Sequence, residues 1–326
     1  MPSAITHMLL VKNLQSYDLS PRLKATLAAG KYFLQVGAVG PDLPYSSKAS
    51  ISGLLFDNES ELADKFHYNE ANEIPLRALK NIKNSSNHTK MERRYLFNFF
   101  AGYIAHIVAD GVIHPFVRDK VGNYSENQTE HRILEMRLDV LFNNHLTAQT
   151  GNNTEFNYTN IHDELLNIGD YNEVNTVVKL FKKLIKEVYK LNYDTELIRD
   201  WICSLHRLLS VAEGDHPSIY RNLSLFDGIL YKNYSDLEDK RDELLILKSP
   251  KDGLINNFMH NDQVHFFDDC IPQFYERYIP ILKKAYAYIY HNGTELNDED
   301  IPAIDLDTGR EELYANNLDM IPVFWS

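Results

Sequence analysis

Cysteine is scarce in this sequence of 326 residues, because Cys203 and Cys270 are its only two. Both lie in apolar, helix-like stretches, and no Cys-x-x-Cys pair exists, which excludes a cysteine-based zinc ribbon. We expect two buried, reduced thiols rather than a disulfide, and therefore no fold that depends on disulfide staples.

Positive charge is also in short supply. The chain has 33 Lys and Arg against 46 Asp and Glu, which gives a formal net charge of −13 at pH 7. That balance argues against a stable complex with nucleic acid through a basic surface. A nucleic acid is still allowed as a substrate, because bound metal ions supply positive charge locally.

Long apolar runs are the third thing this chain lacks. The stretch from Met1 to Lys12 has no basic leader ahead of a long apolar run, so we expect no signal peptide. No segment reaches the ~20 apolar residues that a transmembrane helix needs. We therefore expect a cytoplasmic protein without a transmembrane segment, with enough hydrophobic residues for a substantial core.

Helical periodicity dominates and strand-like alternation is rare, which predicts an all-α fold. Ser20 is the expected N-cap of the second helix, with Pro21 in its first position. From about Asp298 we expect an extended arm that docks by its aromatic end. The expected helices cover residues 6–14, 20–35, 61–67, 74–82, 90–113, 126–146, 176–191, 195–211, 236–247 and 267–290.

Side chains that can ligate a metal are spaced four residues apart in two of these helices. A four-residue interval places such side chains on one helical face, and imidazole with carboxylate is the ligand set of zinc sites that keep a position for water. Pro115 lacks an amide hydrogen, so we expect the helix to kink or end there. The set consists of His106, Asp110 and His114, followed by His131 and Glu135.

A plainer interpretation is that His106 and His114 are core histidines with Asp110 as their hydrogen-bond partner. Any one of these residues alone favours that interpretation. The five together favour a metal, because an unliganded carboxylate buried among imidazoles is costly. Asp42, in a Gly- and Pro-rich loop, fits either a catalytic loop or an exposed turn.

The order of the candidate ligands resembles the pattern of the zinc-dependent phospholipase C family, whose relatives include fungal single-strand-specific nucleases and phospholipase C/D-type domains. The resemblance covers about residues 1–140. It implies a multi-helix phospholipase C/nuclease-like bundle with a metal cleft that holds two zinc ions, and up to three. The candidates are His7, Asp42, His67, His106, Asp110, His114, His131 and Glu135.

The resemblance also implies how the ligands are shared. One zinc would be held by Asp42, His67, His106 and Asp110, and a second by His114, His131 and Glu135. A third would lie between Asp110 and His7. The terminal amine and carbonyl would complete that third site, at Pro2 after loss of Met1, where the family has a tryptophan.

The activity implied by the resemblance is that of a zinc-dependent phosphoric diester hydrolase. A metal-bound hydroxide, oriented by Asp42 as general base, would attack the phosphate ester in line. The favoured substrate is a phospholipid or another small phosphodiester. A single-strand nuclease with the same metal chemistry, and a non-catalytic helical scaffold braced by metals, stay open as alternatives.

All candidate ligands precede residue 140. This position suggests a phospholipase C-like catalytic region over residues 1–150. It also suggests a helical C-terminal region over residues 151–326 that packs on the first.

Overall fold

The structure, a computed structural model, describes residues 4–47, 60–149, 174–213, 218–224, 227–248, 263–317 and 319–325. Nearly all regular structure in these ranges is helical, which confirms the predicted all-α fold. The only strands described are β1 (Ile246–Lys248) and β2 (Gln263–His265), an antiparallel pair. The helices are α1 (Ala4–Lys12), α2 (Pro21–Ala29), α3 (Lys31–Gly37), α4 (Ser60–Tyr68), α5 (Glu73–Asn84), α6 (Lys90–Val121), α7 (Gln128–Gln149), α9 (Val174–Tyr189), α10 (Thr195–Glu213), α11 (Ser218–Arg221), α12 (Arg241–Leu245) and α13 (Ile271–Tyr290).

Helix α6 is the centre of the fold. It begins at a capping box, in which the Thr89 hydroxyl accepts from the Glu92 amide and the Glu92 carboxylate accepts from the Thr89 amide. Its length and apolar composition would suffice to cross a bilayer, contrary to our expectation that no segment does, but its most apolar stretch is buried inside the protein. Composition of this kind is typical of a core helix that is covered on all sides.

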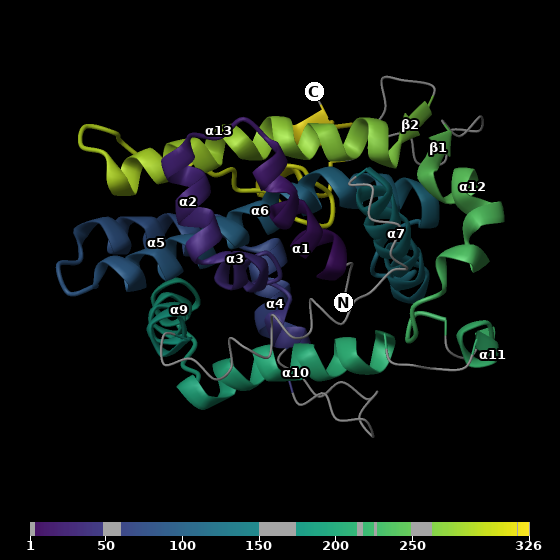
Figure 1. Ribbon diagram of the computed structural model, residues 1–326, viewed down its shortest axis with the longest axis horizontal. Helices are drawn as coiled ribbons and strands as arrows, with labels where there is room; N and C mark the ends of the chain where they lie inside the picture. The colour runs from purple at the N-terminus through teal and green to yellow at the C-terminus, as the bar shows by residue number, and fades with distance from the viewer. Residues whose placement is uncertain are drawn as a thin grey trace.

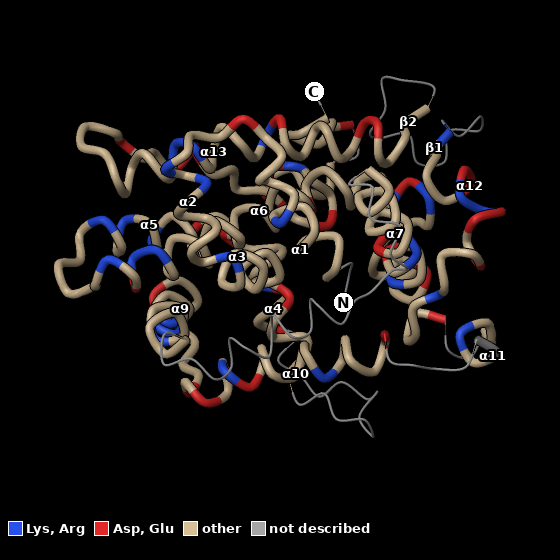
Figure 2. Tube along the Cα trace, viewed as in Figure 1, with Lys and Arg blue, Asp and Glu red and all other residues tan. Residues whose placement is uncertain are grey.

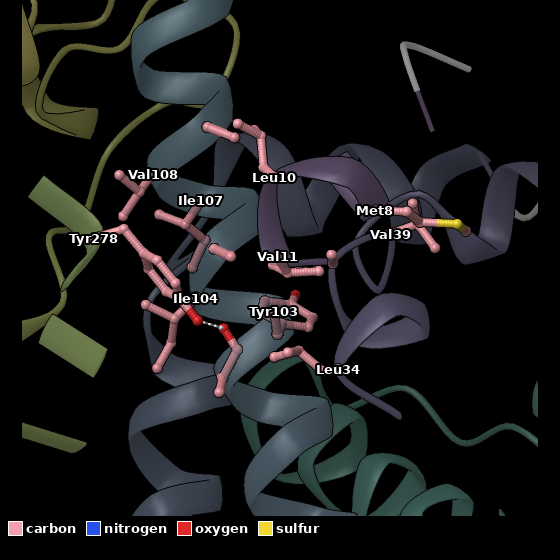
Figure 3. Packing of buried hydrophobic residues seen from close by; sticks show 14 of the residues in the cluster. Met8, Leu10, Val11, Leu34, Val39, Tyr103, Ile104, Ile107, Val108 and Tyr278 are labelled. Atoms are coloured by element: carbon pink, nitrogen blue, oxygen red, sulfur yellow. Dashed lines mark hydrogen bonds between the residues drawn. The ribbon is translucent and has the colours of Figure 1, made fainter. Parts of the chain in front are cut away.

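Other helices pack against α6 (Figure 1). α13 runs along one long edge of the molecule and α10 along the opposite edge, with α6 between them. Helices α1, α3, α5, α7, α9 and α13 all contact α6. In the close view of the core, Tyr278 of α13 lies beside Val108 of α6, and its hydroxyl donates to the Ala101 carbonyl at 2.9 Å (Figure 3).

Several expected elements differ from the structure. The helix over residues 20–35 is two helices, which meet at Gly30, although Ser20 caps the first as predicted by accepting from the Leu23 amide. The helix over residues 236–247 was wrong for most of its length. Short 3-10 turns occupy its start, and Ile246 and Leu247 pair with β2 instead.

Pro115 neither ends nor interrupts α6, which continues to Val121. Proline inside a helix costs about 3 kcal/mol. Ile113, Phe116 and Val117 around it are buried, and each such side chain contributes about 1.5–3 kcal/mol. Burial therefore outweighs the cost of the proline, and His114 stays in line with Asp110.

The expectation of a docked tail is confirmed. Phe324 is buried, and the Trp325 indole donates to the carbonyl of Val112 on α6 at 3.2 Å. The expected boundary between the two regions, at residue 150, falls outside the described residues and stays a prediction.

Candidate metal centre

Five elements bring the eight candidate residues to the middle of α6. His7 comes from α1, Asp42 from the turn after α3 and His67 from the end of α4. His106, Asp110 and His114 lie on α6, and His131 and Glu135 lie on α7. All eight side chains are buried. Burial excludes the interpretation of Asp42 as an exposed turn residue.

Asp110 is the hub of the cluster, with histidines on both of its oxygens. Its Oδ2 lies 3.0 Å from Nε2 of His106 and 3.8 Å from Nε2 of His67. Its Oδ1 lies 3.1 Å from Nε2 of His7 and 3.6 Å from Nε2 of His114. Each oxygen of the carboxylate could therefore bind a cation together with the histidines on its own side.

Two overlapping groups of three ligand atoms lie close enough to share an ion. One consists of His7, His106 and Asp110, and the other of Asp42, His67 and His106, with all ligand atoms of a group within 4.8 Å of one another. Asp42 Oδ1 lies 3.2 Å from Nε2 of His67. His106 belongs to both groups, and its ring stacks on that of His7 at a centroid distance of 4.2 Å.

The group predicted to hold the second zinc, His114, His131 and Glu135, is looser in the structure. Glu135 Oε1 lies 3.4 Å from Nε2 of His114, which joins α7 to α6. His131 is near enough for the charges of both Glu135 and His114 to act on its pKa. The chain terminus that the resemblance assigns to a third zinc, Pro2, lies outside the described residues.

Backbone carbonyls fix which nitrogen of each histidine is available. Nδ1 of His67, His106 and His114 lies 2.7–2.8 Å from the carbonyl oxygens of Ala63, Ala38 and Leu306, respectively. A carbonyl oxygen only accepts, so each Nδ1 carries a proton, and Nε2 is the nitrogen that remains to bind a metal. In His131 the arrangement is reversed, because Nε2 contacts the Gly122 carbonyl at 2.6 Å.

The donor atoms fit a cation better than they fit one another. Both oxygens of Asp42 and of Asp110 are buried, as are Nε2 of His67 and of His106, and none of these atoms has a hydrogen-bond partner among the described residues. Buried polar atoms are almost always hydrogen-bonded. Mixed imidazole and carboxylate donors are what zinc ligates.

Electrostatics keep the two aspartates ionised. Burial alone would raise the pKa of Asp110, but His106, His114 and His7 lower it well below its usual value. His106 and His67 also lower the pKa of Asp42, against the effect of burial. For His114, burial lowers the pKa, yet Asp110 and Glu135 raise it to about 10. The cluster thus holds negative carboxylates that attract positive charge.

Helix α1 is fastened to α7 beside the cluster. The amide and hydroxyl of Thr6 both donate to Oδ1 of Asp139, at 2.7 and 2.6 Å, and the Tyr231 hydroxyl donates to Oδ2. Asp139 follows Glu135 by one helical turn. This buried acid therefore fixes the residue next to His7, a function that the sequence spacing did not reveal.

Helices α3 and α6 approach so closely that glycine is required at the contact. A Cβ on Gly37 would lie 1.9 Å from the Phe99 carbonyl oxygen, and one on Gly102 would lie 2.1 Å from that of Leu34. The contact brings the Ala38 carbonyl onto His106 and starts the turn that leads to Asp42.

Three half-buried tyrosines border the cluster, and none of them was among the predicted residues. The Tyr45 ring lies 5.7 Å from that of His67, and the Tyr124 ring lies 5.4 Å from that of His131. The third, Tyr68, follows His67 directly. Burial raises the pKa of Tyr124 to about 12, so its hydroxyl stays protonated at neutral pH. Asp64 accepts from the Tyr45 hydroxyl at 2.7 Å.

Residues far beyond the predicted catalytic region also reach the cluster. The Leu306 carbonyl holds His114, and Asp307 forms an ion pair with Arg118, one turn further along α6. A carbonyl has no sequence signature. Asp307 stands in an acidic tail whose spacing matches no ligand motif, so neither residue could be recognised from the sequence.

Residues 6–194 match the model of the zinc-dependent phospholipase C family, and this range contains all eight candidate residues and covers more than half of the chain. No curated protein and no solved structure matches the chain. Taken with the helical fold and the buried His and Asp cluster, the match shows that the chain belongs to the zinc-dependent phospholipase C family.

Proposed function

We propose that this protein is a zinc-dependent phosphoric diester hydrolase of the phospholipase C type. The observation that carries the proposal is the set of buried donor atoms around Asp110 that lack hydrogen-bond partners among the described residues. His7, Asp42, His67, His106 and Asp110 would hold zinc on one side of the cluster. His114, His131 and Glu135 would hold it on the other.

Zinc ions, when bound, lower the pKa of water and neutralise charge on the phosphate oxygens. The protein's own residues do the rest. Asp110 sets the spacing of the two sides, since each of its oxygens faces a different pair of histidines. Asp42, held ionised by its histidine neighbours, is the group that we assign to orient and deprotonate the attacking water.

The border of the cluster favours a substrate with a cationic group. Aromatic faces of Tyr45, Tyr68 and Tyr124 attract cations, and Asp64 and Asp307 lie near enough to act on the pKa values of Tyr45 and Tyr68. Such a border repels a polyanion. We therefore propose a phospholipid with a positively charged headgroup as the substrate.

The wider charge distribution agrees with that choice. Figure 2 shows Lys and Arg mixed with Asp and Glu over most elements, with a clear run of basic positions on α5. Two of these α5 cations are paired with acids, Arg77 with Glu73 and Lys80 with Asp298. With these two cations paired, α5 does not offer the basic track that a nucleic acid would need.

Metal content tests the site. We expect the wild-type protein, dialysed against trace zinc, to retain at least two zinc ions per chain by mass spectrometry. Asp110→Asn should lose zinc and hydrolase activity together. Asp119→Asn, which changes another aspartate on the same helix outside the cluster, is the matched control and should retain both. Unchanged zinc in Asp110→Asn would overturn the assignment.

A substrate panel tests the reaction. Phosphatidylcholine micelles should yield phosphocholine, phosphatidylglycerol should react more slowly, and a zinc chelator should stop both reactions. Cleavage of single-stranded DNA in place of lipid would support a nuclease instead. Bound zinc without hydrolysis of any member would support a metal-braced scaffold.

A further inference from the structure

A segment outside the family-matched residues reaches the metal centre. We name it the C-terminal strap and define it as residues 301–325, of which all but residue 318 are described. It has little regular structure beyond short 3-10 turns and a bridge between Ile304 and Glu311. The family match ends at residue 194, so the family pattern assigns this segment no task.

One residue of the strap, Leu306, joins two helices that carry candidate ligands. The Leu306 amide donates to the backbone carbonyl of His67 at 2.9 Å, at the end of α4. The Leu306 carbonyl accepts from Nδ1 of His114 on α6 at 2.7 Å. Leu306 is fully buried, so water does not replace either contact. The position of one residue therefore affects both histidines.

The strap is fastened to α6 immediately around His114. Gly309 has a φ of +66°, and a Cβ there would lie 2.5 Å from the carbonyl oxygen of Gly111 and 3.0 Å from the ring of Pro115. The Val323 amide donates to the Gly309 carbonyl at 2.8 Å, which brings the aromatic end of the strap back onto α6. Asp307 adds the ion pair with Arg118.

We infer that the C-terminal strap is a positioning element of the metal centre, in which Leu306 holds His114 and His67 at the separation that the metal ions require. The inference rests on the proposed function. The Leu306 carbonyl selects the tautomer that leaves Nε2 of His114 free for metal, and hydrogen-bond partners of this kind typically change metal affinity 10–100-fold. Leu306 acts through the histidines and touches no reacting atom.

A pair of glycine substitutions tests the inference. Gly309→Ala places a methyl group against the Gly111 backbone and should move the strap away from α6. Gly293→Ala is the matched control, because Gly293 has a similar φ of +84° but no atom within 4 Å of an added Cβ. Both variants carry the strain of a positive φ, and only one displaces the strap.

Zinc affinity, measured by competition with a chromogenic chelator, is the readout. We expect Gly309→Ala to weaken zinc binding by about 10–100-fold and Gly293→Ala to bind like the wild type. Wild-type affinity in Gly309→Ala would overturn the inference and leave the proposed function intact. Failure of the wild-type protein to bind zinc would defeat both.

Hydrogen exchange of the unmodified protein tests the same coupling if Gly309→Ala does not fold. Coupling between two sites is reciprocal, so a strap that supports zinc binding must itself be stabilised by zinc. We expect amide exchange over residues 303–311 to slow when zinc is added to the metal-free protein. Equal exchange with and without zinc in these residues, in protein that binds the metal, would overturn the inference.

Discussion

At the scale of single residues, α6 shows how surroundings decide the charge of identical groups. Asp110 and Asp119 lie on the same helix. Histidines hold the pKa of Asp110 well below its usual value despite burial. Burial raises the pKa of Asp119 to about 8, although Arg118 and Arg310 oppose the shift. One carboxylate is therefore charged at neutral pH, and the other remains largely protonated.

This contrast predicts a pH dependence of stability for Asp119. The unfolded chain releases the proton near pH 3.8, whereas the folded protein retains it to about pH 8. The free energy of unfolding should therefore fall as pH rises between these values, by at most about 1.4 kcal/mol for each unit of pKa shift. Asp119→Asn should remove that part of the slope. Urea denaturation of both proteins at pH 5 and pH 8.5 measures the difference, and parallel slopes would contradict the prediction.

The residue scale also shows what a sequence reveals about a site. Spacings of four residues identified His106, Asp110 and His114, because helical geometry turns an interval into a shared face. The groups that orient the histidines of the cluster are backbone carbonyls, those of Ala38, Ala63, Gly122 and Leu306. Every residue has such a carbonyl, so only the folded chain shows which ones matter.

At the scale of secondary-structure elements, the contact between α3 and α6 determines where Asp42 and the Ala38 carbonyl lie. The two helices approach closely because Gly37 and Gly102 have no side chains at the contact. The turn that carries Asp42 begins directly after α3. The position of this turn relative to α6 therefore depends on the contact between α3 and α6.

Replacement of Gly102 by alanine should destabilise the protein although alanine favours helices. The gain in helix propensity is about 1 kcal/mol. The new Cβ would lie 2.1 Å from the Leu34 carbonyl oxygen and 2.6 Å from the Ala38 nitrogen, and such overpacking costs typically 1–3 kcal/mol or more. We expect a lower urea midpoint for Gly102→Ala than for Gly293→Ala. A higher midpoint would show that α3 can move away without cost.

Element boundaries were predictable where local signals act alone. The cap at Ser20 and the presence of most long helices follow from spacing and capping chemistry. The break at Gly30 and the continuation of α6 through Pro115 depend on tertiary packing. Residues 246–248 form a strand because a partner, β2, lies beside them, and a local pattern does not show a partner.

At the scale of the whole molecule, metal and fold should stabilise each other. A ligand that binds only the folded state adds about 2.7 kcal/mol at a hundredfold excess over its dissociation constant. Removal of zinc also leaves Asp42 and Asp110 buried together without a cation. The stability of the protein should therefore depend on the metal.

We expect a chelator to lower the melting temperature and zinc to restore it. Magnesium should restore less, because it prefers oxygen ligands and this cluster is rich in imidazole. Scanning calorimetry of the chelated protein, with each metal added back, makes the comparison. Equal melting temperatures in all samples would show that the cluster does not retain metal.

Other properties of the whole molecule were less accessible from the sequence. The all-α architecture and the family followed from periodicity and ligand order. The contact of residues 301–325 with the metal centre could not be predicted, because the apolar and acidic residues of a tail do not indicate what they contact. The cytoplasmic location and the division of the chain at residue 150 stay predictions.

The hydrogen bond between His114 and Leu306 spans 192 positions of the chain. Translation proceeds from the N-terminus, so His114 leaves the ribosome long before its acceptor has been synthesised. During that interval the imidazole lacks the carbonyl that selects its tautomer. Assembly of this part of the centre must therefore wait until residue 306 has been synthesised and has reached α6.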